Sequence, residues 1–459
     1  MKLKQLSVLL ILLLILPLFL NYSLPTKAAT QTSQNLYVGI DVAFESIAET
    51  EQLIDNISSY TNFFVIGCTG NYNETRLTVL SQYVYDKNLA FIVYTDTPRY
   101  PSKQWLTDAQ TNWGNKFLGI YYYDEPGGKQ LDQTSYPTLA AAQNNIVASS
   151  QYVSTLYNYS EAANLYVKTL SSVLRNGSYS ITQSFPSQTN YQLFTSDYSL
   201  YWYDYEAGYD TVFAEFALYY NRTINIDLCR GAATVQNKDW GVMITNAYTT
   251  DPWMESGTDL YKDMKLAYDN GAKYIIVFDS NADWTQNVLD PSQQLAIKQF
   301  WDYAKSNPRT IGPVSDRSAY VLPEDYAYGF RAPTLDSIWG LWPSDSLTLD
   351  VGMSMATLFK IFGNNLDIVY PDQLQKIESL GYQNVIFWND PRLLSNAPPI
   401  QSPPPVKIIN AWQPFLISPR LHQNASWLSY STSVYFYSIA FCIIIALAIS
   451  TSLLKFRKR

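Results

Sequence analysis

Four apolar segments in the first half of the chain begin at a constant spacing of 27 residues. They are rich in β-branched and aromatic residues and start at Leu36, Phe63, Ala90 and Phe117. This spacing is about the length of a strand, a helix and two turns, so it predicts parallel strands joined by crossover helices. The capping-box pattern Ser46-Ile47-Ala48-Glu49 predicts the start of the first helix.

The same alternation continues as far as residue 308. Further strands are expected near Leu200 to Tyr203, Thr211 to Glu215, Gly241 to Asn246 and Lys273 to Asp279, and helices near Thr138 to Leu174, Ile224 to Val235, Thr258 to Asn270 and Pro291 to Ser306. The sum is eight strands within residues 36–308. That length and rhythm predict an α/β fold, a (β/α)8 TIM-like barrel, for which about 250 residues is typical. An open doubly wound sheet is the alternative.

Both ends of the chain predict an exported, membrane-anchored protein. Residues 1–28 have a basic start, an apolar run and small residues around Ala28, which is typical of a cleaved signal peptide. An uncleaved N-terminal anchor is the alternative. Residues 434–454 contain no charge and are long enough for a C-terminal transmembrane helix, and the basic tail at 455–459 is expected in the cytoplasm. We therefore expect a single-pass protein of the cell membrane with its main domain extracellular.

Between the barrel and the membrane, the sequence predicts a small domain and a spacer. Residues 313–395 alternate short strands and helices and predict a small α/β domain. Residues 396–433 open with the Pro-rich run Asn396 to Pro405, which cannot form helix or sheet and predicts a stiff linker or stalk.

Potential glycosylation sites agree with an extracellular location. In the presumed mature chain, Asn-x-Ser/Thr triplets occur at Asn56, Asn73, Asn158, Asn176, Asn221 and Asn424. Of the three cysteines, Cys442 falls in the expected membrane span, which leaves Cys68 and Cys229 as the one possible extracellular disulfide. Two cysteines do not define a disulfide framework, so this pairing stays open.

Composition excludes several kinds of chemistry. The 31 basic and 39 acidic residues give a formal net charge of −8, which argues against nucleic-acid binding. One histidine and three cysteines exclude a Ser-His-Asp or Cys-His relay and a multi-histidine metal site. No Gly-x-Gly-x-x-Gly follows the first strand, so a dinucleotide-binding domain has no support. We therefore expect no cofactor and no metal. Carboxylates, hydroxyls and amides remain, and the 38 tyrosines and 12 tryptophans suit neutral, hydroxylated partners.

In a barrel of this type, the functional site lies at the carboxyl ends of the strands. The residues expected there are mostly acidic: Asp41, Glu45, Thr69, Asp96, Asp124 with Glu125, Asp204 with Glu206, Glu215, Asn246 and Asp279. The strongest local signal is the fourth strand's end, Tyr123-Asp124-Glu125-Pro126-Gly127-Gly128. Pro126 predicts an extended Glu125. Burial among tyrosines beside a second carboxylate would raise the pKa of Glu125 into the range of a general acid.

With this motif the chain resembles the barrel-fold glycoside hydrolases, in many of which Asn-Glu-Pro or Asp-Glu-Pro ends the fourth strand. The resemblance covers the expected barrel and implies that Glu125 protonates the leaving group of a carbohydrate substrate. Asp124 occupies the position where many of these enzymes have Asn. Their customary Glu at the end of the seventh strand is missing, because this chain has Ile244-Thr245-Asn246 there.

The second catalytic carboxylate must then come from another position. Asp204, within Tyr201-Trp202-Tyr203-Asp204-Tyr205-Glu206, is the first choice, and Glu215 and Asp279 are the alternatives. The residues expected to bind substrate are Asp124, Tyr123, Trp202, Asn246 and Asp279. Trp105, Trp113, Trp253 and Trp284 could also stack on sugar rings, although about half of the tryptophans are expected to pack in the core.

Structural roles are the alternative for each of these residues taken singly. Asp124 and Glu125 could begin a surface turn, and Asp96 and Asp279 could cap helices. Arg230 could be a salt-bridge partner or a ligand contact.

Two functions therefore remain in view. The first is a cell-surface glycoside hydrolase that uses a carboxylate pair, retaining if the carboxyls are about 5 Å apart and inverting if they are about 6.5 to 9.5 Å apart. The second is a non-catalytic carbohydrate-binding or structural protein on a barrel scaffold. An acid-pair peptidase lacks support, since no Asp-Thr-Gly or Asp-Ser-Gly triplet occurs. The glycan and the oligomeric state are not indicated.

Overall fold

The computed structural model of the protein describes ten stretches of the chain. They are residues 36–43, 46–67, 73–95, 100–131, 158–175, 191–217, 221–245, 255–281, 285–330 and 337–394. All of them belong to one compact unit that begins at Leu36.

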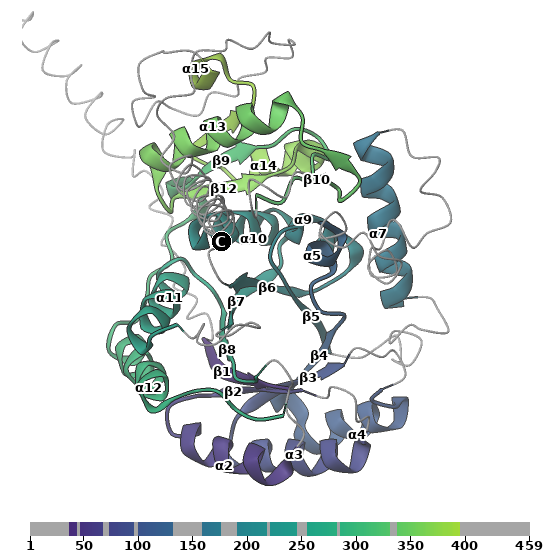
Figure 1. Cartoon of the computed structure of the whole chain (residues 1–459), viewed down its shortest axis with the longest axis vertical. Helices are drawn as coiled ribbons and strands as arrows, with labels where there is room; N and C mark the ends of the chain where they lie inside the picture. The colour runs from purple at the N-terminus through teal and green to yellow at the C-terminus, as the bar shows by residue number, and fades with distance from the viewer. Residues whose placement is uncertain are drawn as a thin grey trace, which may run out of the picture. The chain divides into compact units, whose positions relative to one another are not determined.

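Eight parallel strands form a closed barrel in which each strand pairs with the next in sequence and β8 pairs with β1 (Figure 1). The strands are β1 (Tyr37–Val42), β2 (Phe63–Ile66), β3 (Ala90–Thr95), β4 (Phe117–Tyr122), β5 (Gln192–Asp197), β6 (Thr211–Phe216), β7 (Asp239–Thr245) and β8 (Tyr274–Phe278). The predicted (β/α)8 class is confirmed, and the open-sheet alternative is excluded because β1 and β8 are paired.

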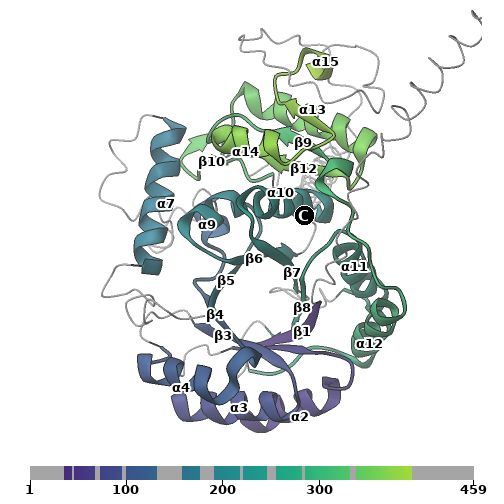
Figure 2. The ribbon, with the colours of Figure 1, turned by 180° about the vertical axis from the view of Figure 1, so that it is seen from behind.

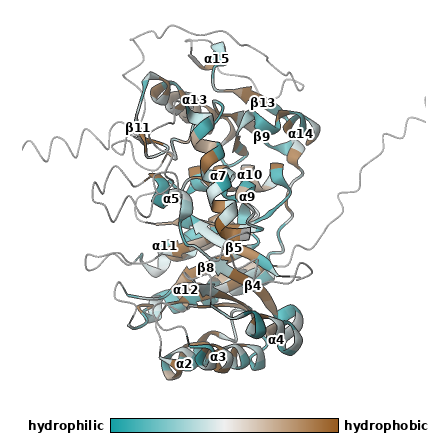
Figure 3. Ribbon diagram, turned by 90° about the vertical axis from the view of Figure 1, so that its right-hand side faces the viewer, coloured by the Kyte–Doolittle hydropathy of each residue, from teal (hydrophilic) through white to brown (hydrophobic). Residues whose placement is uncertain are grey.

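Helices surround the barrel, as the reverse view also shows (Figure 2). They are α2 (Ile47–Ile57), α3 (Glu74–Asp86), α4 (Lys103–Trp113), α5 (Pro126–Leu131), α7 (Tyr159–Arg175), α9 (Tyr201–Ala207), α10 (Arg222–Gln236), α11 (Gly257–Asp269) and α12 (Pro291–Ser306). Hydrophilic and hydrophobic residues alternate along α2 and α3, as expected of helices that cover a core (Figure 3). The predicted cap at Ser46 is present, with its Oγ accepting from Glu49 N at 3.3 Å.

Alternate residues of each strand face two separate apolar cores. In β1, Val38, Ile40 and Val42 belong to the core between strands and helices. A second core fills the barrel interior and contains Phe63, Val65, Ala90, Ile92, Tyr121, Phe194, Phe213, Met243, Tyr274 and Ile276. This alternation directs Asp41 of β1 and Glu215 of β6 into the barrel interior at the carboxyl ends of their strands, which we call the barrel mouth.

A small α/β module follows the barrel. Its three-stranded parallel sheet has the order β12-β9-β13 and consists of β9 (Ser318–Val321), β12 (Leu366–Val369) and β13 (Asn384–Phe387). Its other elements are the short strands β10 (Ser337–Ile338) and β11 (Trp342–Pro343), the helices α13 (Ser346–Phe362), α14 (Leu374–Ser379) and α15 (Pro391–Leu394), and the 3-10 turn η5 (Pro371–Gln373). The strands and helices of the module, and their order along the chain, agree with the small α/β unit expected from the sequence.

Helix α10 packs closely on this module. A Cβ on Gly231 would lie 2.5 Å from the carbonyl oxygen of Ile368, so only glycine permits this approach. The neighbouring Arg230 is buried and donates to Asp367 Oδ1 at 2.6 Å, while Arg317 donates to Asp367 Oδ2 at 2.7 Å. Of the two roles considered for Arg230, the structure shows the salt bridge.

The predicted segment at Leu200 to Tyr203 is wrong as a strand. These residues enter helix α9, and the fifth strand is β5, at Gln192–Asp197. Aromatic residues favour strands by propensity, but here Tyr201, Trp202 and Tyr203 are all buried by helix packing. The predicted helix Thr138 to Leu174 is observed as α7 in its second part, and residues 132–157 lie outside the described residues.

Three predictions fall outside the described residues: the signal peptide at 1–28, the linker at 396–433 and the membrane span at 434–454. Among the helices that are described, none has the length and apolar character needed to cross a bilayer.

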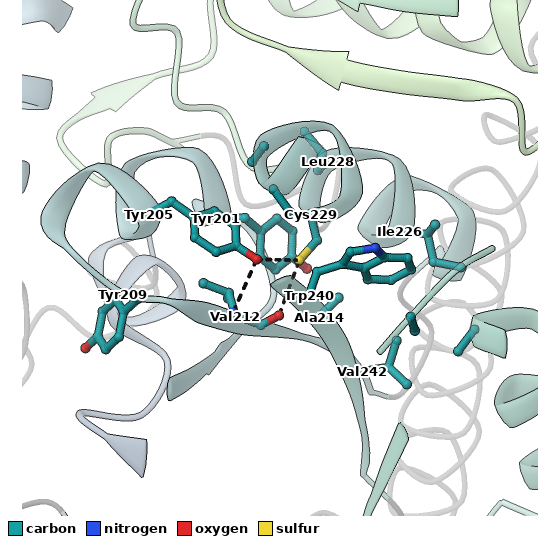
Figure 4. Close-up of a cluster of buried hydrophobic side chains, with 14 of the residues drawn as sticks. Tyr201, Tyr205, Tyr209, Val212, Ala214, Ile226, Leu228, Cys229, Trp240 and Val242 are labelled. Atoms are coloured by element: carbon teal, nitrogen blue, oxygen red, sulfur yellow. Dashed lines mark hydrogen bonds between the residues drawn. The ribbon is translucent and has the colours of Figure 1, made fainter. Parts of the chain in front are cut away.

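Cys229 is a free, buried thiol. Its Sγ lies 3.9 Å from the Tyr205 hydroxyl and 3.6 Å from the carbonyl oxygen of Val212, within a cluster that includes Tyr201 and Trp240 (Figure 4). Burial raises the pKa of this thiol, which disfavours its ionised form. The disulfide considered from the sequence is therefore not formed by Cys229, and Cys68 lies outside the described residues.

Candidate active site at the barrel mouth

Hydrogen bonds connect the ends of three neighbouring strands at the barrel mouth. Ser196 Oγ, at the end of β5, lies 2.8 Å from Asp124 Oδ1 and 2.5 Å from Glu215 Oε1. The Tyr121 hydroxyl contacts both Asp124 and Ser196 Oγ, the latter at 2.7 Å. Four contacts share two hydroxyl protons, so at most two of them are hydrogen bonds at one time, and a proton on one of the carboxyls would allow a third.

Glu125 is held in a strained backbone conformation beside this network. Its φ is +52°, in the left-handed region that only glycine adopts without cost, and Tyr123 has φ +58°. The prediction that Pro126 would make Glu125 extended is therefore wrong. The backbone is fixed instead by hydrogen bonds, because Glu125 N donates to Ser196 O at 3.0 Å and Glu125 O accepts from Lys129 N at 2.9 Å.

Asp197, at the end of β5, anchors the loop that presents Glu125. Its carboxylate accepts from the backbone N–H groups of Gly127 at 2.5 Å, Gly128 at 2.9 Å, Tyr198 at 2.6 Å and Ser199 at 3.1 Å. The glycine pair makes this contact possible, since a Cβ on Gly128 would lie 1.9 Å from the Tyr198 ring. The glycines thus serve the packing of α5 against the end of β5.

Glu125 and Glu215 form an acid pair, with their side chains close enough for a hydrogen bond. Burial and the charge of Asp124 raise the pKa of Glu125 to about 7. Glu215 is only 3% exposed, and burial followed by the charges of Glu125 and Asp124 raises its pKa well above the usual range. Glu125 therefore ionises first, and the pair holds one proton over a range of pH above about 7.

Lys129 supplies positive charge to one side of the acid pair. Its ammonium donates to the main-chain oxygen of Asp124 at 2.5 Å and lies 5.8 Å from the centre of the Tyr123 ring. Burial alone would lower the pKa of Lys129, but the charges of Asp124 and Glu125 outweigh burial and raise it. The lysine is thus held as a cation beside Asp124 and Glu125.

Asp41 faces the same mouth from β1. It is 5% exposed, and burial together with the charge of Asp124 raises its pKa well above the usual range. Its main-chain oxygen accepts from Asp279 N at 2.8 Å, which joins the ends of β1 and β8.

Asp204 lies in α9 and not at a strand end. It is fully buried, and its Oδ1 accepts from the Tyr166 hydroxyl of α7 at 2.7 Å. Burial and the nearby Asp197 raise its pKa. The carboxyl that the structure brings together with Glu125 is Glu215, which the sequence offered as an alternative.

The remaining predicted site residues fall into three groups. Asp124 and the partly exposed Tyr123 lie beside Glu125, and Asn246 lies outside the described residues. Trp202 is 3% exposed, with its ring 5.8 Å from that of Tyr370 in the module. Asp279 is buried, and its Oδ1 accepts from Val288 N and Leu289 N in the segment before α12, whose cap is Asp290.

The candidate tryptophan platforms that are described are core residues. Trp105 and Trp113, both in α4, are 6% and 3% exposed, and their Nε1 groups donate to Thr78 and Gln82 of α3. Trp253 and Trp284 lie outside the described residues. Sequence reasoning missed Ser196, Tyr121 and Asp197. The available signal was the polar end of β5, Thr195-Ser196-Asp197, which the misplaced fifth strand concealed.

Metal binding has no candidate in the described part of the chain, where no three His, Cys, Asp or Glu side chains are arranged to hold an ion.

No protein-family model matches the chain, and no curated protein matches it either. Solved structures do match, and glycoside hydrolases recur among them. The α-L-fucosidase isoenzyme 2 from Paenibacillus thiaminolyticus is 10% identical, with a TM-score of 0.44 and 76% of this chain covered; the chain spans 59% of that enzyme's length.

A β-1,4-D-mannanase from Cryptopygus antarcticus is 13% identical, with a TM-score of 0.33, and the match covers 57% of this chain and 89% of that one. A 3-hexulose-6-phosphate synthase also matches, at 8% identity and a TM-score of 0.30, with 58% of this chain and 99% of that one covered. All three TM-scores are below 0.5, so function is derived below from the residues of this chain alone.

Proposed function

We propose that the protein is a glycoside hydrolase that cleaves its substrate with the acid pair Glu125 and Glu215. The observation that supports this most is the proximity of two carboxyls with raised pKa values, the partly exposed Glu125 and the buried Glu215, at the mouth of a closed barrel. Hydrolysis of a glycosidic bond requires one protonated and one ionised carboxyl, and this pair holds them without a cofactor.

The roles follow from the order of ionisation. Glu125 ionises first and is the carboxylate, while the more deeply buried Glu215 keeps the proton and is the acid. This assignment reverses the role that the sequence suggested for Glu125. Carboxyls close enough for a hydrogen bond favour the short separation of a retaining mechanism over the longer inverting one.

The proposed reaction has two steps. In the first, a Glu125 carboxylate oxygen bonds to the anomeric carbon, the bond from that carbon to the leaving oxygen breaks, and the Glu215 proton passes to that oxygen. In the second, the Glu215 carboxylate takes a proton from water, the water oxygen bonds to the anomeric carbon, and Glu125 is released.

Neighbouring groups hold Glu125 and Glu215 in position. Ser196 and Tyr121 tie Asp124 to Glu215, and Asp197 fixes the loop of Glu125. Asp124 and Tyr123, which are partly exposed beside the pair, are proposed to contact the sugar. These contacts preorganise the site before substrate arrives.

The test compares three acid-to-amide variants on a panel of glycans and aryl glycosides. Glu125→Gln and Glu215→Gln should each lower kcat by about 100-fold or more. Glu206→Gln is the matched control, because burial and Asp372 raise its pKa to about 8 at a position in α9 away from the pair. Unchanged turnover in either of the first two variants would overturn the proposal, and so would glycan binding by the wild type without any product.

The pH profile tests the assignment of roles. If Glu125 is the carboxylate, kcat/KM should rise as pH increases through about 7 and fall only at higher pH, when Glu215 ionises. A profile that falls through pH 7 would instead give Glu125 the acid role.

We further propose that this domain is displayed outside the cell by the apolar segment at 434–454. The four described acceptor asparagines, Asn56, Asn73, Asn158 and Asn221, are all exposed, which supports a glycosylated exterior. Removal of residues 434–459 should release the protein into the medium, with a mass that enzymatic deglycosylation lowers. Retention in the cytoplasm would contradict this location.

A further inference from the structure

The carboxyl group of Asp41 has no hydrogen-bond partner among the described residues, although the residue is 95% buried. Its main-chain oxygen accepts from Asp279 N at 2.8 Å. Strand alternation directs the side chain into the barrel, because the flanking Ile40 and Val42 belong to the outer core. Among the described residues, the Asp41 oxygens are not counted with the fully buried atoms that lack a partner, so they reach the space of the mouth and are available to a ligand group.

The charge around Asp41 indicates the kind of group. Within the described part of the chain, the charge that acts on it most is that of Asp124, which is also negative. Among the described residues, Lys129 is the cation beside these acids, and its charge acts on Asp124, Glu125 and Glu215. In the described part of the chain, no cation is among the groups whose charge acts on Asp41.

We propose that the barrel mouth selects glycans that carry a free, protonated amino group, and that Asp41 binds this ammonium. The inference rests on the proposed glycoside hydrolase function and names its substrate class. An ammonium supplies the charge and the N–H donors that the Asp41 carboxyl lacks, as charge-assisted hydrogen bonds do.

Other sugars fit these observations less well. A neutral hydroxyl could hydrogen-bond to the Asp41 carboxyl but would supply no positive charge to it. A uronic acid would add a third negative charge beside the two aspartates. Binding of an amino sugar has a further signature, because an ammonium favours ionised Asp41 and lowers its raised pKa, so protons are released on binding.

The experiment measures binding to the full chain of three tetrasaccharides that differ in charge. They are a glucosamine oligomer, an N-acetylglucosamine oligomer and a galacturonic acid oligomer. We expect the glucosamine oligomer to bind at least tenfold more tightly than the other two, the effect of one charge-assisted contact. Calorimetry in two buffers of different ionisation enthalpy should show proton release for the glucosamine oligomer only.

Two variants assign the effect to Asp41. Asp41→Asn should reduce the preference for the glucosamine oligomer to within about twofold and abolish proton release. Its binding of the N-acetylated oligomer should not change. Asp302→Asn is the matched control, because Asp302 is an exposed carboxylate of α12, and it should leave both quantities unchanged. Asp41→Ser gives the same test if Asp41→Asn fails to fold, as judged by circular dichroism.

The outcomes separate the two proposals. Equal binding of the charged and acetylated oligomers, or a preference that survives in both Asp41 variants, would overturn this inference and leave the hydrolase proposal standing if any glycan is cleaved. Tight, Asp41-dependent binding of the glucosamine oligomer without product would support the inference and contradict the hydrolase function.

Discussion

Carboxylates are buried at two places in this molecule, and they are neutralised differently. At the contact between α10 and the module, Asp227 and Asp367 are bonded by Arg230, and Asp367 also by Arg317. At the barrel mouth, Asp41, Glu125 and Glu215 are accompanied by Asp124, and the cation beside them in the described part of the chain is Lys129.

This difference separates structural acids from chemical ones. The acids of the module contact have guanidinium partners at 2.6 to 2.9 Å, so their charge holds two parts of the fold together. Burial raises the pKa of Asp227 too, but the largest charge that acts on Asp227 is that of Arg230, which lowers its pKa. The largest charges that act on Glu125 and Glu215 are those of other acids, which raise their pKa values. Such clusters of acids with raised pKa values are typical of functional sites.

Removal of the arginine at the module contact should produce the largest loss of stability. In Arg230→Met, Asp227 and one oxygen of Asp367 remain buried without that cation, so we expect a loss of about 3 to 5 kcal/mol in the free energy of unfolding. Urea denaturation at pH 7 measures it. A loss below about 1 kcal/mol would show that Arg230 does not neutralise these acids. The acids of the module contact would then not differ from those of the barrel mouth in the way described.

Asp197 tests a third case, in which a buried acid at the mouth is balanced by backbone N–H groups. Asp197→Ala leaves the N–H groups of Gly127, Gly128, Tyr198 and Ser199 without their acceptor, and we expect a loss of roughly 3 kcal/mol. Hydrolysis should fall as well, because the loop of Glu125 loses its anchor. Wild-type stability and turnover in this variant would contradict the anchoring role.

Replacement of Glu125, one member of the acid pair, should stabilise the fold, but only at high pH. The folded pKa of Glu125, about 7, lies above its ordinary value of 4.5, so its protonated form stabilises the fold. That contribution is complete below pH 4.5 and is lost as pH rises through 7. Glu125→Gln avoids the loss and should be more stable than wild type at pH 8.5, by about 1 to 3 kcal/mol, and nearly equal at pH 4.5. Thermal melts at both pH values decide this, and an equal or lower Tm at pH 8.5 would contradict it.

An exposed ion pair should have the smallest effect. Lys262 and Asp259 lie 2.8 Å apart in α11 with side chains 67% and 57% exposed, so Lys262→Gln should change stability by less than about 0.5 kcal/mol. This variant is measured beside Arg230→Met. A loss as large as that of the buried arginine would show that burial does not distinguish the two kinds of ion pair.

Seven of the eight barrel strands could be located from the sequence because each is an apolar run bounded by turn residues. The fifth could not, since the inward residues near its end are polar. Thr195, Ser196 and Asp197 belong to the site and lack the pattern of a core strand. The aromatic run of α9, which begins four residues after Asp197, has the composition of a strand but forms a short buried helix.

The wrongly predicted strand at Leu200 to Tyr203 also explains why the sequence favoured Asp204 over Glu215 as the partner of Glu125. It put Asp204 at a strand end and therefore at the mouth, whereas the structure places Asp204 in a helix, bonded to Tyr166. Glu125 could be found from the Pro and Gly residues that follow it. Glu215 lies close to Glu125 because β4 pairs with β5 and β5 pairs with β6. Local sequence does not specify this pairing of strands.

Titration of the Glu125 and Glu215 carboxyls by NMR, with 13C-labelled glutamate in wild type and in Glu125→Gln, tests the central claim most directly. The wild type should show two coupled transitions, one with its midpoint near pH 7 and one at higher pH. Glu125→Gln should show a single transition, that of Glu215, with a midpoint at lower pH than the upper transition of the wild type. Two independent transitions near the ordinary value of 4.5 would show that the carboxyls do not share a proton, and the acid pair would lose its role.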